Sequence, residues 1–155
     1  MQFTSKEDIE APIERVFAEV TDFHAFERSA LRRGADVKRT DVLTDPGVGM
    51  SWYTSFRFRG KQREVNLELS EYDPPNGLVL DYTSSSVQGR FLVELVALSR
   101  GRTRMTVTLV LEPRTMAARF MLQSLKLARG NLNKRFKLRL ADYAMDVEER
   151  SQRNV

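Results

Sequence analysis

The chain has 155 residues, 41% of them hydrophobic, and it contains no cysteine. This length corresponds to about one domain with a core of its own, and the absence of cysteine excludes disulfides, thiolate metal sites and a cysteine nucleophile. Basic residues exceed acidic ones by 25 − 21 = 4, a mild excess that permits an anionic partner without requiring one.

No segment of the sequence has the pattern of a targeting signal or a membrane helix. The N-terminal residues lack a basic start followed by an apolar run, so they do not resemble a signal peptide. No apolar run approaches the roughly 20 residues that a membrane helix requires. We also find no repeat, linker or low-complexity tract. We therefore expect a cytoplasmic protein with a single domain over residues 1–155.

The first part of the sequence predicts a strand followed by two short helices. Residues 2–10 are strand-like. The helix predicted over 12–21 begins with a proline, which suits a first turn because that position needs no N–H donor. Asp22 can cap a second helix over 22–33, and Gly34 can end it.

The middle of the sequence predicts a series of strands, because apolar residues alternate there with a period of two. Turn-forming segments separate the strands at 45–49, 60–61, 73–77 and 99–102. Strands joined by such short turns pair antiparallel. The predicted strands cover residues 35–43, Met50 to Arg59, Val65 to Ser70, a segment from Leu78, Phe91 to Ala97, and Met105 to Leu111.

The last part of the sequence predicts one long helix, from Thr115 to about Glu149. Its apolar residues recur at steps of three and four, and Gly130 is a place for a bend. Only this helix is long enough to cover the apolar face of the sheet. We therefore predict an α+β helix-grip fold: a curved antiparallel sheet of about seven strands wrapped on a long C-terminal helix, with two short helices after the first strand.

Four stretches carry a resemblance to a known family. They are IEAPIERVFAEVTDF at 9–23, GVGMSWYTSFRFRGK at 47–61, EYDPPNGLVLDYTS at 71–84 and GRFLVELVALSRGRTRMTVTLVLEP at 89–113. Together they resemble the START-like, or SRPBCC, superfamily, which includes the pollen allergen (Bet v 1-like) type and the polyketide cyclase/dehydrase and lipid transport proteins. The resemblance implies a cavity between sheet and long helix. Family members bind lipids, sterols, polyketides, quinones or hormones, and some cyclise or hydrolyse them.

The alternation predicts which side chains face such a cavity. They are mostly apolar with a few polar groups, as ligand pockets usually are, although the same residues could fill a solid core. The predicted ligand-binding residues of the sheet are Trp52, Thr54, Phe56, Phe58, Leu67, Leu69, Leu80, Tyr82, Ser84, Phe91, Val93, Met105 and Val107. Those of the helix are Met121, Ser124, Leu125 and Ala128.

The sequence contains no catalytic constellation. His24 is the only histidine, which rules out a metal site built from several histidines, and no GxSxG motif occurs. Alternation directs Glu68, Asp81 and Glu94 outward and leaves the direction of Asp41 and Glu64 open. The predicted cavity is therefore uncharged, apart from Arg57 or Arg59 at its mouth if the register bulges. We predict no catalytic residue, no metal and no cofactor.

These features predict a protein that binds or transports a small hydrophobic ligand, such as a lipid, a quinone or a polyketide-like molecule. The alternative is an enzyme of the cyclase or dehydratase kind with Tyr82 or His24 as acid or base. A further alternative is a macromolecule-binding member of the family that uses the basic face of its last helix.

Two basic clusters bear on that last alternative. Eight basic residues and no acidic one lie between Arg114 and Arg139, and a second cluster surrounds Gly60. Such faces are often simply solvated, but they also fit an anionic membrane surface. Nucleic acid is disfavoured because the sequence identifies no exposed stacking aromatics. A homodimer remains a candidate because further apolar residues, Phe120, Leu122 and Leu127, broaden the stripe of the helix.

Overall fold

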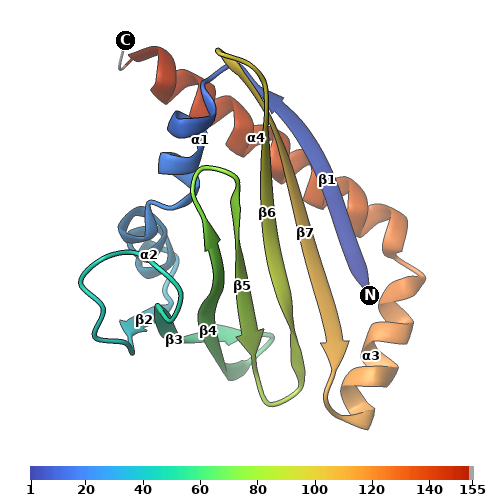
Figure 1. The fold of residues 1–155 in the computed structure, drawn as a ribbon. Coiled ribbons are helices and arrows are strands. Elements are labelled where there is room, and N and C mark those ends of the chain that lie inside the picture. The colour runs from blue at the N-terminus through green and yellow to red at the C-terminus, as the bar shows by residue number, and fades with distance from the viewer. Residues whose placement is uncertain (154–155) are drawn as a thin grey trace.

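The computed structural model describes residues 1–153, which form four helices and one antiparallel sheet of seven strands (Figure 1). The strand order is β1-β7-β6-β5-β4-β3-β2. This confirms the predicted helix-grip architecture. The strands are β1 (Gln2–Ile9), β2 (Asp36–Arg39), β3 (Ser51–Phe58), β4 (Lys61–Asp73), β5 (Gly77–Thr83), β6 (Val87–Ser99) and β7 (Arg102–Pro113). The helices are α1 (Ile13–Val20), α2 (Phe23–Arg32), α3 (Met116–Lys126) and α4 (Arg129–Arg153).

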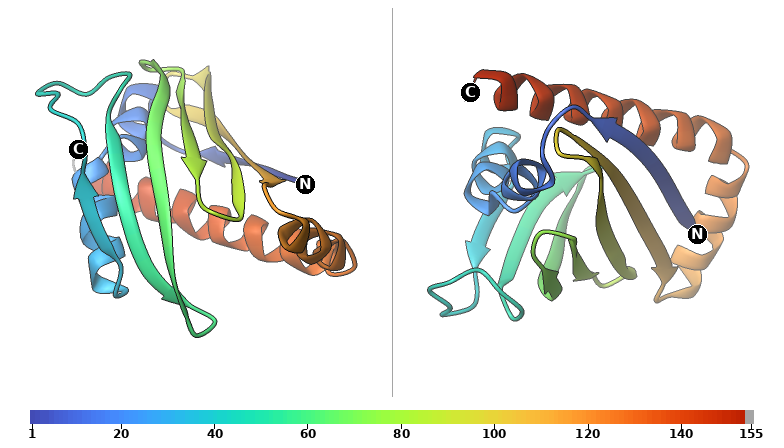
Figure 2. Two further views of the ribbon diagram at one scale, coloured as in Figure 1. Left: turned by 90° about the horizontal axis from the view of Figure 1, so that it is seen from below. Right: turned by 45° about the horizontal axis from the view of Figure 1, so that its top comes forward.

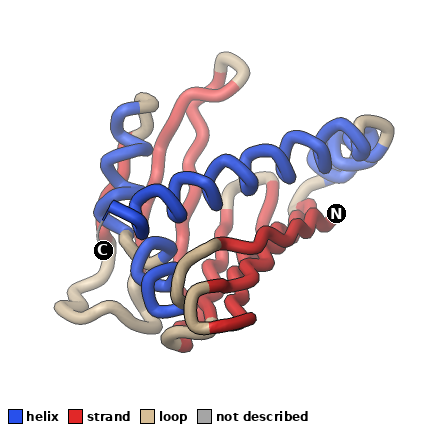
Figure 3. The backbone as a smooth tube through the Cα atoms, turned by 90° about the horizontal axis from the view of Figure 1, so that it is seen from above, coloured by secondary structure: helices blue, strands red, loops and turns tan. Residues whose placement is uncertain are grey.

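The sheet curves, and helix α4 runs across its open side (Figures 2 and 3). Alternate residues of the strands therefore face the inner side of the sheet, which is the period-two pattern seen in the sequence. The fully buried residues Ile9, Leu69, Met105 and Val147 come from three strands and from α4. They belong to the core that joins the sheet to the helix.

The two short helices form as their capping residues predict. Pro12 precedes α1 in an extended conformation, and α1 buries Val16, Phe17 and Val20. The Asp22 carboxylate accepts a hydrogen bond from the backbone N–H of Ala25 at 3.2 Å, which satisfies a free donor at the start of α2. Gly34 follows the helix with a φ of +91°, a value that favours glycine.

The single long helix predicted from Thr115 to about Glu149 is wrong, because the chain forms two helices there. Thr115 caps α3 by accepting a hydrogen bond from the N–H of Ala118 at 3.0 Å. The break falls at Leu127 and Ala128, whose N–H groups bond to the carbonyls three residues back, at 3.2 Å and 3.0 Å. Gly130 lies within the first turn of α4 and is not the break.

Helix α3 does not cover the open face of the sheet. It follows β7 at the end of the sheet and packs there through the buried residues Ala118 and Leu122. The helix residues predicted to face the cavity therefore lie elsewhere: Met121, Ser124 and Ala128 are exposed. Periodicity alone placed them inward, and the position of α3 beyond the last strand turns that face to solvent.

Candidate ligand-binding site

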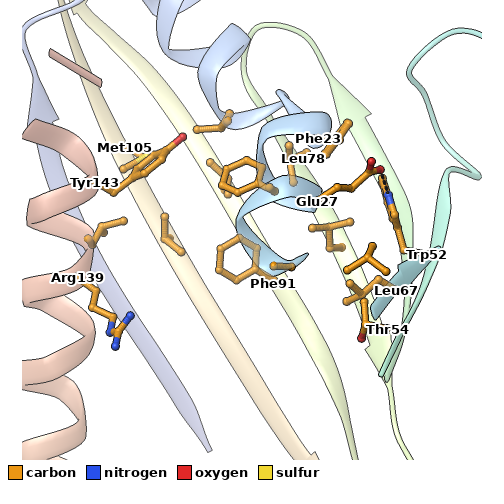
Figure 4. Close-up of a pocket in the computed structure, with 18 of the residues that line it drawn as sticks. Phe23, Glu27, Trp52, Thr54, Leu67, Leu78, Phe91, Met105, Arg139 and Tyr143 are labelled. Carbon is orange, nitrogen blue, oxygen red and sulfur yellow. Dashed lines mark hydrogen bonds between the residues drawn. The ribbon is translucent and has the colours of Figure 1, made fainter. Parts of the chain in front are cut away.

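A cavity of about 540 Å³ lies between the sheet, α2 and α4 (Figure 4). This volume falls within the range of small-molecule pockets in proteins. Six of the seven strands and three helices contribute side chains to its wall. The lining residues are Val20, Phe23, Phe26, Glu27, Ala30, Val37, Trp52, Thr54, Leu67, Leu78, Leu80, Phe91, Val93, Met105, Val107, Phe136, Arg139, Leu140 and Tyr143.

Eight of the seventeen predicted ligand-binding residues line this cavity, all of them on strands. Their side chains point into the cavity because they occupy alternate positions of β3 to β7. Within this group Thr54 is polar, and its hydroxyl donates a hydrogen bond to the carbonyl of Val65 at 3.0 Å. The eight residues are Trp52, Thr54, Leu67, Leu80, Phe91, Val93, Met105 and Val107.

The other nine predicted residues lie outside the lining, for three different reasons. Leu69 is fully buried in the core. Four residues lie toward the end of the sheet where β3 turns into β4 and β5 into β6, and four belong to α3 or to the turn after it. The first four are Phe56, Phe58, Tyr82 and Ser84, and the second four are Met121, Ser124, Leu125 and Ala128. Leu125 instead lines a separate apolar hollow of about 250 Å³.

Tyr82 and His24, the two acid/base candidates, do not line the cavity. The Tyr82 hydroxyl donates a hydrogen bond to the carbonyl of Val110, and burial, with a smaller effect of Glu112, raises the pKa of Tyr82 to about 12. Gly89 leaves room for this ring, since a Cβ there would lie 2.5 Å from the hydroxyl. The His24 side chain is 79% exposed, and its Nδ1 lies 3.5 Å from a carboxylate oxygen of Glu27.

The prediction of an uncharged cavity is wrong, because Glu27 of α2 and Arg139 of α4 belong to its wall. Arg57 or Arg59 would reach the mouth only through a bulge in the register. β3 and β4 pair without such a shift, and both arginines are exposed and lie outside the lining. The strand pattern could not reveal Glu27 or Arg139 because both charges come from helices. Glu27 follows Phe26, and Arg139 precedes Leu140, so each charged residue stands beside an apolar lining residue.

The Glu27 carboxylate is held by the cavity wall itself. Its Oε1 accepts a hydrogen bond from the indole N–H of Trp52 at 2.8 Å, drawn as a dashed line in Figure 4. The Arg39 guanidinium lies 5.6 Å from the centre of the same indole ring, a cation–π arrangement. Arg39 in turn forms an ion pair with Asp41. The hydrogen bond from Arg39 is the largest of the effects that hold the pKa of the Asp41 carboxyl well below its usual range. This chain of contacts fixes Trp52 as one wall of the cavity.

Arg139 and Tyr143 project from α4 and differ in their surroundings. Figure 4 shows the guanidinium and the hydroxyl pointing to different sides. Arg139 is exposed at the cavity, and within residues 1–153 its guanidinium forms no ion pair. The Tyr143 hydroxyl is buried and has no hydrogen-bond partner among the described residues, and burial raises the pKa of this phenol well above its usual range.

The sequence carried part of the signal for the residues that the prediction missed. Phe136, Leu140 and Tyr143 belong to the three-and-four stripe of the last helix, but the prediction from periodicity assigns only the first half of that stripe to the cavity wall. Phe23 and Phe26 are two large apolar residues directly after the first short helix, which the sequence itself shows. Which half of the stripe faces the sheet depends on where the helix breaks.

Within residues 1–153 no group of three or more His, Cys, Asp or Glu side chains is placed to hold a metal ion. The described helices also include none with the length and apolar character needed to span a membrane.

Comparisons with solved structures find the same fold in several bacterial proteins. The ZhuI aromatase/cyclase from a Streptomyces species is 14% identical, with a TM-score of 0.66 over 97% of this chain and 94% of that chain. A protein from Thermus thermophilus is 17% identical, with a TM-score of 0.65 over 97% and 99%. A START superfamily protein from Mycobacterium smegmatis is 13% identical, with a TM-score of 0.56 over 86% and 95%.

At these identities the structural likeness establishes the fold and nothing about the ligand. No curated protein matches the sequence. The sequence profile of the family described as "Polyketide cyclase / dehydrase and lipid transport" matches residues 1–142 of the 155. The chain therefore belongs to the polyketide cyclase/dehydrase and lipid transport family, whose START-like relatives share its helix-grip fold.

Proposed function

We propose that this protein binds and carries a small hydrophobic molecule in the cavity between the sheet and α4. The observation that carries the proposal is the wall of that cavity, in which seventeen of nineteen lining residues are uncharged and most are aliphatic or aromatic. Burying an apolar molecule against such a wall removes apolar surface from water, which is favourable at roughly 25 cal/mol per Å². The family, which includes lipid transport proteins, agrees with this role.

The polar groups of the cavity favour a carrier over an enzyme. A general acid or base must reach the reacting atoms, and both His24 and Tyr82 stand outside the lining. Glu27 lines the cavity, but it already accepts the hydrogen bond of Trp52. Within residues 1–153, Arg139 is the charged lining residue without an ion pair, so we propose that it meets the polar end of an amphipathic ligand.

The ligand class that fits these features is a molecule with an apolar body and one anionic or strongly polar end, such as a lipid, a quinone or a polyketide-like compound. In the proposed binding mode the apolar body contacts Leu67, Leu80, Phe91 and Val107, and the polar end lies near Arg139. A small hydrophobic molecule is the partner that this function requires.

Native mass spectrometry of the purified protein, together with titration of an environment-sensitive apolar fluorescent probe, tests the proposal. We expect a bound lipid-like mass or saturable probe binding. Leu67→Trp should weaken probe binding by about tenfold or more, because the larger ring occupies part of the cavity. Val65→Trp is the matched control, since Val65 lies two residues earlier on β4, on the same face but outside the lining.

Two results would contradict the proposal. One is the absence of any bound mass or saturable probe binding at micromolar protein. The other is an equal loss of probe binding in Leu67→Trp and Val65→Trp, since that would place the probe outside the cavity.

A further inference from the structure

Helix α3 turns an apolar strip toward solvent. Met116, Phe120 and Leu127 are 63%, 62% and 93% exposed, while Ala118 and Leu122 hold the opposite side of the helix against the protein. Met116 and Phe120 are four positions apart and share one side of α3. Leu127, the C-cap residue, keeps helical backbone angles and lies on the same side, seven positions after Phe120. Soluble proteins rarely expose so many large apolar residues on one short segment, and such strips usually mark a binding surface.

Basic residues flank this strip. Arg119 and Lys126 are seven positions apart on one flank of α3, between the exposed strip and the buried side. Arg114 precedes the helix, Arg129 begins α4, and no acidic residue occurs between Arg114 and Arg139. The helix therefore combines an outward apolar strip with a positive border.

A second exposed apolar residue lies at the same end of the sheet. Strand pairing places the β3–β4 turn, the β5–β6 turn and the end of β7 at this end, from which α3 continues (Figure 1). Phe58 is 54% exposed beside the β3–β4 turn, and the Arg59 guanidinium lies 5.4 Å from the centre of its ring. Arg57 and Lys61 are exposed around it. Helix α3 and the β3–β4 turn, at one end of the molecule, thus both combine exposed apolar side chains with basic ones.

We propose that this end of the protein docks on an anionic phospholipid bilayer. Helix α3 lies along the bilayer surface with Met116, Phe120 and Leu127 in the acyl boundary and with Arg119 and Lys126 at the headgroups. Amphipathic helices with this distribution bind at lipid interfaces, and each basic residue near an anionic surface adds to the attraction. Phe58 and its neighbouring basic residues form a second, smaller contact.

The charges favour a bilayer over the other partners that could cover α3. In a symmetric contact between two copies, the positive border of each α3 would face the positive border of the other, which is unfavourable. An RNA would pair with the basic residues but would leave Met116 and Leu127 in water. An anionic bilayer satisfies both the charges and the apolar strip.

The position of the docking surface also suits the proposed function. Only this link between docking and ligand uptake rests on that function. The apolar hollow of about 250 Å³ lies beside α3 and is lined by Leu125 and Leu132. Phe136 belongs both to this hollow and to the main cavity. A hydrophobic ligand that leaves the bilayer at α3 would thus meet an apolar hollow that shares a wall residue with the main cavity.

Vesicle co-sedimentation of the full chain tests the docking. We expect binding to vesicles of phosphatidylcholine with phosphatidylglycerol, weak binding to pure phosphatidylcholine, and release at about 1 M salt, where charges are screened beyond roughly 3 Å. Arg119→Gln with Lys126→Gln should weaken binding by about 30-fold, and Phe120→Ser with Leu127→Ser by about tenfold or more. None of these residues lines the main cavity, so binding of the fluorescent probe in solution should not change.

Matched controls remove similar groups elsewhere. Val96→Ser with Leu98→Ser removes exposed apolar side chains at the opposite end of the sheet, and Arg28→Gln with Arg100→Gln removes two exposed charges. These variants should bind vesicles like the original protein. Equal binding to neutral and anionic vesicles, a dimer in sedimentation velocity that Phe120→Ser with Leu127→Ser abolishes, or RNA binding without vesicle binding would overturn the proposal. Because probe binding is measured separately, failure of the docking leaves the proposed function standing.

Discussion

Helices α3 and α4 follow one another along the chain and carry apolar residues at the same steps of three and four, but they bury those residues differently. In α4, Leu140, Ala144 and Val147 are buried against the sheet. In α3, Ala118 and Leu122 are buried, while Met116 and Phe120 face solvent. The difference comes from position, because α3 follows β7 at the end of the sheet and α4 runs across its open side (Figures 1 and 2).

The two helices show that having an apolar face and burying that face are separate properties, which a sequence pattern does not distinguish. Periodicity shows that a helix has an apolar face, and the topology decides what covers that face. For α4 the cover is the sheet and, in our proposal, a ligand. For α3 no part of the described chain covers the outward strip, and the basic border indicates an anionic lipid surface as its partner.

The largest expected effect contrasts one buried residue of α4 with one exposed residue of α3. Val147 is fully buried, so Val147→Asp places an unpaired charge in the core and should lower the free energy of unfolding by at least ~3 kcal/mol. Phe120→Asp should change that free energy by no more than ~0.5 kcal/mol, because the side chain is in water. Urea denaturation followed by far-UV circular dichroism measures both.

Val147→Asp could leave too little folded protein for such a measurement. Val147→Ala then serves in its place, with an expected cost of about 2 kcal/mol from the lost methyl groups and the cavity that they leave. A cost for Phe120→Asp as large as that for Val147→Ala would show that α3 buries Phe120 in solution, and the contrast between the helices would fail.

A smaller effect concerns the Tyr143 hydroxyl of α4, a buried polar group that has no hydrogen-bond partner in the described part of the chain. An unsatisfied buried hydroxyl is unfavourable, so Tyr143→Phe should raise the free energy of unfolding of the ligand-free protein by roughly 1 kcal/mol. An apolar probe should bind with unchanged affinity, because the ring that lines the cavity is kept. Thermal unfolding and probe titration measure the two quantities. A marked loss of probe affinity would instead show that a ligand uses this hydroxyl.

Much of the fold could be predicted from local patterns. The period of two in the strands, Asp22 before α2 and Gly34 after it each specify a local conformation with a physical cause, and the structure agrees with each. The break between α3 and α4 has no such local marker. Gly130 was the one visible candidate, and the chain instead turns at Leu127 and Ala128, residues that are compatible with a continuous helix.

The site could be predicted only on its sheet side. Alternation placed Trp52, Leu80 and Phe91 toward the cavity because the side chains of a strand have a fixed period. Alternation does not show how far along the sheet the cavity extends, so it also predicts Phe58 and Ser84, which lie toward the end of the sheet and outside the lining. Glu27 and Arg139 depend on how α2 and α4 are rotated over the sheet, which is a property of tertiary packing.

The smallest expected effect concerns Gly130, next to the break between α3 and α4. A Cβ added at Gly130 meets no atom within 4 Å, and glycine is less favourable than alanine within a helix. Gly130→Ala should therefore raise the free energy of unfolding by about 0.5 kcal/mol and leave the break in place, because the hydrogen bonds that form it belong to Leu127 and Ala128. Backbone chemical shifts of residues 124–130 would report this directly. If they became those of one continuous helix, Gly130 would be the cause of the break, and the outward strip of α3 would follow from one glycine rather than from the end of β7.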